Sequence, residues 1–151
     1  MKYLGILLST LLFSQQTLAI NCYLTMVKGD CWISYDLTVD ILDAHTAKAI
    51  KTVVVPANQA WIRQEFDCKP GDKIAFESKF SPVFWEGDDD KTFKGQRHWK
   101  LPDVIKKGET GWNVPVCFPE HFADVPAPPT GNSNCHCNFT NIPKVVPPKL
   151  P

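Results

Sequence analysis

Apolar and polar residues alternate one by one along much of this chain. In the segment WISYDLTVDIL, every second residue from position 33 to position 41 is apolar, and those between are polar or charged. The apolar positions are Ile33, Tyr35, Leu37, Val39 and Ile41. Successive side chains of a β-strand point to opposite faces, so this pattern predicts a strand with one buried face. No long amphipathic helix is visible, and the chain is expected to be all-β.

Further strands are predicted at short spacing. AIKTVVV (residues 49–55) is rich in β-branched residues. WIRQEFDC (61–68) and KIAFESKF (73–80) flank KPGD, a sequence typical of a type II turn, and are therefore predicted to form a hairpin. Ile74 and Phe76 are expected to share the buried face of the first strand, because charged residues occupy the positions between them.

The second half of the chain continues the pattern. PVFW (82–85) and WNVPVCF (112–118) are predicted as strands, and LPDVIKK (101–107) as one helical turn. Short strands broken by proline and glycine are typical of an antiparallel β-sandwich, and an immunoglobulin-like version is the expected fold. Hydrophobic residues make up 44% of the chain, which fits one core. The sandwich domain is assigned to residues 20–125.

Residues 1–19 have the three regions of a secretory signal peptide. Lys2 supplies a positive charge, an apolar stretch follows from Leu4 to Phe13, and Thr17 and Ala19 are the small residues of a cleavage site. The apolar stretch is too short to span a membrane. The mature chain is therefore expected to be periplasmic or secreted, with no membrane insertion after cleavage.

All six cysteines follow the predicted cleavage site, and an even number in an oxidising compartment indicates disulfides. They are Cys22, Cys31, Cys68, Cys117, Cys135 and Cys137. Cys68 and Cys117 are predicted to join the two sheets. At least one of Cys135 and Cys137 is expected to bond to Cys22 or Cys31. The alternative is that Cys135 bonds to Cys137, and Cys22 to Cys31.

The C-terminal segment, residues 126–151, is rich in proline and contains the sequence Cys-His-Cys. Seven of the thirteen prolines lie there. Such a segment favours extended, polyproline-like backbone and cannot build a core of its own. It is expected to be tied to the sandwich by a disulfide and to engage a partner beyond that point.

Two cysteine-containing motifs also suit a metal. Cys135, His136 and Cys137 offer ligands for zinc or Cu(I). Cys117 and His121, together with KPGDKIAF and His45, resemble the copper-binding loop and strands of cupredoxins, which implies a copper held by a cysteine thiolate and histidines. No Met follows His121, however, and either site needs reduced thiols after export. No metal and no cofactor is assigned.

Two charged clusters lie between residues 85 and 100. Trp85 precedes four carboxylates, at Glu86, Asp88, Asp89 and Asp90, which could bind calcium or remain solvated. A possible binding patch combines aromatic and basic residues: Trp85, Arg97, His98, Trp99 and Lys100. Sixteen basic residues balance sixteen acidic ones over the whole chain, which argues against nucleic acid as a partner.

No sequence motif of a known catalytic site occurs, so no catalytic residue is assigned and an enzyme is not expected. The leading hypothesis is an exported, disulfide-stabilised module that binds another protein or serves a structural role in an envelope or secretion complex. One alternative is a module that binds a small ligand or a metal. The other is a secreted enzyme or effector. Asn138 begins a glycosylation sequon, which has meaning only in a eukaryotic host.

Overall fold

The structure is a computed structural model that describes residues 20–129 and 135–145. The predicted signal peptide lies outside these residues. The strands are β1 (Asn21–Lys28), β2 (Asp36–Asp43), β3 (Ala49–Val55), β4 (Trp61–Phe66), β5 (Lys73–Ser81), β6 (Phe93–Lys94), β7 (Trp99–Lys100) and β8 (Gly111–Phe118), with one short 3-10 helix, η1 (Asp30–Trp32). The described residues contain no α-helix, which confirms the all-β class, and no helix among them could cross a membrane.

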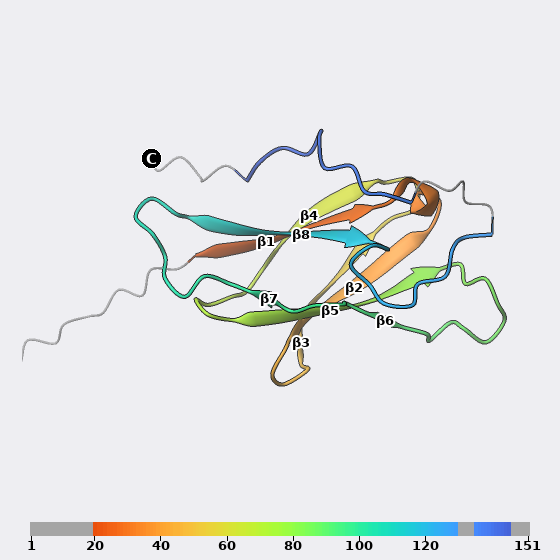
Figure 1. Cartoon of the computed structure of the whole chain (residues 1–151), viewed down its shortest axis with the longest axis horizontal. Coiled ribbons are helices and arrows are strands. Elements are labelled where there is room, and N and C mark those ends of the chain that lie inside the picture. The colour runs from red at the N-terminus through yellow and green to blue at the C-terminus, as the bar shows by residue number, and fades with distance from the viewer. Residues whose placement is uncertain (1–19, 130–134, 146–151) are drawn as a thin grey trace, which may run out of the picture.

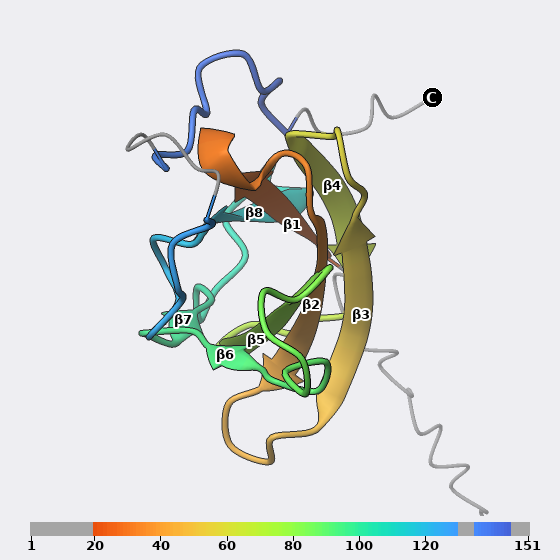
Figure 2. The same ribbon diagram turned by 90° about the vertical axis from the view of Figure 1, so that its right-hand side faces the viewer.

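The strands form two sheets around one core (Figures 1 and 2). One sheet has the order β4-β1-β8, and the other has the order β3-β2-β5-β6, with β7 also paired to β5. All strand pairs are antiparallel except β1 with β8, which is parallel. This arrangement is consistent with a β-sandwich that is not purely antiparallel. The immunoglobulin-like strand order remains a prediction.

The predicted core positions of β2 and β5 are confirmed. Leu37, Val39 and Ile41 are buried against the other sheet, as are Ile74 and Phe76. Apolar residues alternate with polar and charged residues in both strands, so only the face that carries the apolar residues can be buried.

The predicted start of β2 is wrong. Ile33 and Tyr35 lie before the strand, in the turn after η1, and both are half-buried. The reason is Trp32, whose ring is fully buried with its centroid 4.7 Å from that of Phe80 and 4.8 Å from that of Phe118. Because Trp32 is buried at an even-numbered position, the strand alternation cannot extend back through it.

The hairpin predicted around KPGD is also wrong, although the turn itself forms. Gly71 has a φ of 80°, and the amide of Asp72 donates to the carbonyl of Lys69 at 3.2 Å. However, β4 pairs with β1 while β5 pairs with β2, so the turn carries the chain from one sheet to the other. The local alternation of a strand shows that one face is buried but does not show which sheet it joins.

Three smaller features differ from expectation. Residues 82–85 form bends in the β5–β6 connection rather than a strand, and residues 101–107 form bends and a turn rather than a helical turn. β1 was not predicted as a strand, yet it is the central strand of its sheet and its side chains are almost all buried.

All six cysteines are paired, but the predicted Cys68–Cys117 bridge is wrong. The bridges are Cys22–Cys68, Cys31–Cys135 and Cys117–Cys137. The Cys117 side chain lies on the face of β8 opposite to its core residues, whereas Cys22 faces the core and reaches Cys68 just after β4. The expected bond between the C-terminal segment and Cys31 is confirmed, and the alternative Cys135–Cys137 and Cys22–Cys31 bridges are excluded.

Candidate functional site

The C-terminal strap, which we define as residues 135–145, runs along the outer side of the three-stranded sheet (Figures 1 and 2). Cys135 bonds to Cys31 in η1, with Cα atoms 5.0 Å apart, and Cys137 bonds to Cys117 in β8, with Cα atoms 5.8 Å apart. The two bridges are two residues apart in the strap but reach different elements of the fold. They therefore hold both the position and the direction of its first residues.

Gly29 lets the strap approach the end of β1 closely. A Cβ atom at this position would lie 1.9 Å from the carbonyl oxygen of Cys135, which is a backbone atom and cannot rotate away. Any side chain here would therefore displace the strap.

Arg63 of β4 holds the far end of the strap. Its Nη2 donates to the carbonyl oxygen of Pro143 at 2.6 Å, and its Nε donates to Oγ1 of Thr25 at 2.9 Å. Thr25 in turn donates to Oδ1 of Asn113 at 2.5 Å, so the hydrogen bonds cross all three strands of the sheet. Thr25 is 1% exposed, although it lies on the side opposite to the core side chains of β1.

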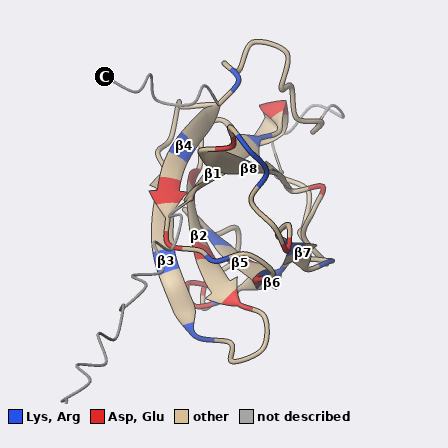
Figure 3. Cartoon of the chain, turned by 90° about the vertical axis from the view of Figure 1, so that its left-hand side faces the viewer, with Lys and Arg blue, Asp and Glu red and all other residues tan. Residues whose placement is uncertain are grey.

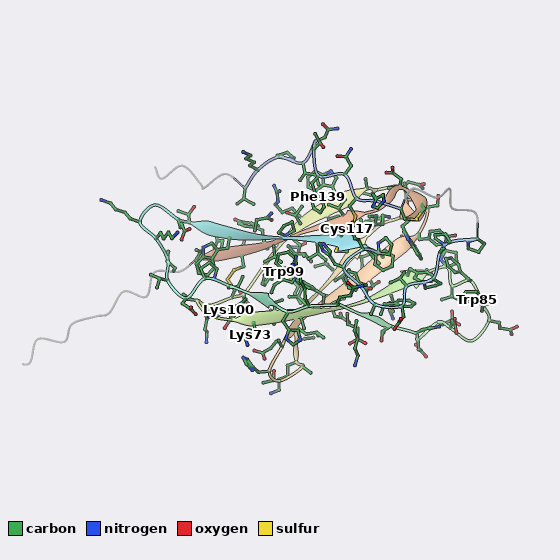
Figure 4. The ribbon with its side chains drawn as sticks, viewed as in Figure 1. Lys73, Trp85, Trp99, Lys100, Cys117 and Phe139 are labelled. Carbon is green, nitrogen blue, oxygen red and sulfur yellow. A yellow bond between two sulfur atoms is a disulfide. The ribbon has the colours of Figure 1, made fainter. Side chains whose placement is uncertain are left out.

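Between these two anchors the strap makes a turn. The amide of Thr140 donates to Oδ1 of Asn138 at 2.9 Å, and the amide of Ile142 donates to the carbonyl of Phe139 at 3.2 Å. The Phe139 side chain is 38% exposed and lies on the strap over the outer side of the three-stranded sheet (Figure 4). None of the residues 135–145 is fully buried, so the strap adds no side chain to the buried core.

The predicted binding patch does not form one surface. Trp85 lies at one end of the molecule, well away from Trp99 and Lys100 (Figure 4). Arg97 stacks over the Trp99 ring at 4.3 Å, and Lys100 pairs with Asp103 at 2.9 Å. Whether either part of the patch binds a ligand stays a prediction.

The acidic turn and the basic residues do not pair with each other. Asp88 pairs instead with Lys91, three residues later in the same loop, at 3.7 Å. Trp85 is 55% exposed. Basic and acidic positions are interspersed over both sheets and the loops (Figure 3). Within the described ranges, no group of three or more His, Cys, Asp and Glu side chains is placed to hold a metal ion.

His98 lines a pocket of about 210 Å³ beside the β2–β3 turn. The pocket is also lined by the apolar residues Leu42 and Ala75 and by charged residues that include Glu77 and Lys94. This volume is below the range of about 300–1,000 Å³ that is usual for small-ligand sites. A larger depression, of about 610 Å³, is open and lined by residues 58–63 alone. Neither favours the small-ligand alternative.

The cysteines of both proposed metal motifs are oxidised. Cys117 and Cys137 bond to each other, and Cys135 bonds to Cys31, so no thiolate remains for copper or zinc. His45 is exposed in the β2–β3 turn, and His136 is exposed in the strap. The resemblance to cupredoxins therefore does not extend to a copper site in this oxidised chain.

His121 has a structural role beside the Cys117–Cys137 bridge. Its Nδ1 accepts a hydrogen bond from the amide of Cys117 at 3.0 Å, and its ring lies 6.0 Å from the ring of Trp99. Burial lowers the pKa of His121 below its usual value, nearby Arg97 lowers it further, and Glu120 opposes the shift. The neutral ring that accepts from Cys117 is thus the favoured form.

Three residues that shape this region were not predicted as important: Lys28, Gly29 and Arg63. Lys28 is 2% exposed, and its Nζ donates to the carbonyls of Ile33, Tyr35 and Pro56 at 3.3, 2.7 and 2.8 Å. Burial lowers the pKa of this lysine, and Asp36 partly opposes the shift. Lys28 follows Cys22, Leu24 and Met26 at every second position of β1, so these side chains share one face of the strand. This alternation was a signal in the sequence that the lysine side chain points inward.

Comparison with models of known protein families, with curated proteins and with solved structures found no match for this chain.

Proposed function

We propose that this protein is an exported, disulfide-stabilised module of an envelope or secretion complex, which binds another protein through its C-terminal strap. Three disulfides in a small β-rich chain fit an oxidising compartment outside the cytoplasm. Binding to a protein, rather than catalysis, is the activity that the strap supports best.

One observation carries the proposal: two of the three disulfides anchor a segment in which no side chain is fully buried. Ordering a chain costs about 1–2 kcal/mol per residue, which a buried core normally offsets. The strap is only partly buried and has little of that compensation, so we infer that the bridges and Arg63 supply much of its order. A segment that is already ordered loses less conformational entropy on binding a partner than a free segment does, and this favours binding.

The two-sheet body provides the support for this arrangement. The strap anchors come from η1, β4 and β8, and the three-stranded sheet links the last two through β1. A partner that contacts the strap therefore meets a segment whose backbone is placed by the fold.

The test compares the tagged, full mature protein with a variant that ends at residue 129 and carries Cys31→Ser and Cys117→Ser. Both are produced in the native cells and cross-linked before purification, and the captured proteins are identified by mass spectrometry. We expect a defined protein to accompany the full chain and to be lost from the shortened one. Circular dichroism of the shortened chain must still report the β-fold. Capture of the same protein by both would contradict the role of the strap.

A further inference from the structure

Four large apolar side chains are exposed among the described residues: Val54, Trp85, Val104 and Phe139. Val54 lies in β3, while Trp85 and Val104 belong to connections that the chain needs in order to join its strands. Phe139 differs, because it follows β8 and lies in a segment that joins no two of the described strands. No connection between these strands therefore requires Phe139 to be exposed.

The backbone around Phe139 is held at both ends and within the turn. Cys137, two residues before it, is bonded to β8, and the carbonyl of Pro143, four residues after it, accepts from Arg63. Inside the turn, Thr140 donates to the Asn138 side chain and Ile142 donates to the Phe139 carbonyl. An aromatic side chain on such a backbone loses little further freedom when it is bound.

We propose that Phe139 is the anchor residue of the strap and inserts into an apolar pocket of a partner protein about the size of a phenyl ring. This rests on the proposed function and names the part of the strap that carries the binding energy. Large aromatic side chains are typical centres of protein interfaces, with polar backbone contacts around them.

The charge of the strap predicts how binding of the partner should depend on salt. Residues 135–145 contain no carboxylate, and their ionisable side chains are those of His136 and Lys144. Binding centred on Phe139 should therefore change little with ionic strength. Binding through Trp85, which is followed by Glu86 and three aspartates, would weaken strongly with added salt.

The experiment places a photo-reactive phenylalanine analogue at position 139 of the full mature protein in its native cells. Matched variants carry it at positions 54, 85 and 104. We expect one discrete adduct from position 139 and none from the other three. The adduct alone does not support the proposal. The cross-linked protein is next purified and its affinity measured for the parent chain, Phe139→Ala and the control Val104→Ala, each with an unchanged melting temperature.

Phe139→Ala should weaken binding about 10- to 30-fold, as truncation of an interface anchor does, and Val104→Ala should leave it unchanged. Raising salt from low to physiological strength should change the affinity of the parent less than about threefold.

A partner captured from position 54, 85 or 104 but not 139 overturns the anchor and leaves the proposed function standing. An affinity of Phe139→Ala within twofold of the parent likewise overturns the anchor and leaves the proposed function standing. Adducts from none of the four positions count against the proposed function as well, and an adduct with a second copy of this chain overturns the choice of partner.

Discussion

Lys28 shows how one residue can organise a turn from inside the protein. Its ammonium group is surrounded by three backbone carbonyls, two of which precede β2 and one of which follows β3. The same lysine thus links the end of β1, in the three-stranded sheet, to both ends of the β2–β3 hairpin in the other sheet. A buried charge is tolerated here because hydrogen bonds replace its hydration.

Lys28→Met should lower the free energy of unfolding by about 2–4 kcal/mol, because it removes the three hydrogen bonds that the ammonium group donates to backbone carbonyls. Urea denaturation with the disulfides intact measures the change. The matched control is Lys79→Met on the exposed face of β5, for which we expect a change within about 0.5 kcal/mol. Equal effects of the two substitutions would show that the carbonyl contacts of Lys28 contribute little.

His121 should make stability depend on pH in the acidic direction. Its pKa is lowered in the folded protein by burial and by Arg97, so the unfolded chain binds the proton more readily. The free energy of unfolding should therefore decrease as pH falls through the usual histidine value of about 6.5 towards the lower folded value.

The measurement compares unfolding at pH 7.5 and pH 5.5 for the parent and for His121→Asn, which keeps an acceptor near the position of Nδ1 but does not titrate. We expect a smaller difference between the two pH values in the variant. His45→Asn, in the exposed β2–β3 turn, serves as the control and should behave as the parent does. An unchanged pH dependence in His121→Asn would contradict this role.

At the scale of elements, the edge of β8 is shielded by its own sequence. Pro115 has no amide hydrogen, and both backbone groups of Cys117 are occupied by His121, which accepts from the amide and donates to the carbonyl at 3.0 Å each. Proline and occupied backbone groups discourage pairing with a further strand. The β8 edge is therefore a poor site for the addition of a strand from another chain.

The three disulfides should differ in their effect on stability because they hold different elements. Cys22–Cys68 joins the buried β1 to the segment after β4 across 46 residues, so its removal by paired alanine substitutions should cost about 4 kcal/mol. Removal of Cys117–Cys137 should cost less than about 2 kcal/mol, because the strap can detach while the core stays folded. Urea denaturation gives both values. A larger effect for Cys117–Cys137 would mean that the strap supports the core.

At the scale of the whole molecule, export and oxidation should give a protein with a defined N-terminus and three disulfides. We expect the exported protein to begin at Ile20, and its intact mass to lie two hydrogens below the all-thiol mass for each of three disulfides. Non-reducing mass spectrometry of the protein purified from outside the cytoplasm measures both. A retained residue 1–19 segment would contradict the predicted signal peptide, and a mass with free thiols would contradict the pairing.

The sequence by itself determined the all-β class, the oxidised cysteines and part of the core. Leu37, Val39 and Ile41 could be placed inside because the two-residue period of a strand is local and is written directly in the order of side chains. The same reasoning was incomplete at β1, where Thr25 and Val27 are buried on the outward side and obscure the alternation. It failed at Trp32, where packing with Phe80 and Phe118 interrupted the strand.

Only the tertiary structure decided how these pieces are connected. The KPGD turn has the same local geometry whether it joins two strands of one sheet or passes between sheets, so the partner of β4 could not be inferred from it. The pairing of Cys117 with Cys137, and the contact of Arg63 with Pro143, depend on residues far apart in the chain that meet only after both sheets have formed. Local propensity acts over a few residues, whereas these contacts depend on which buried faces pack together.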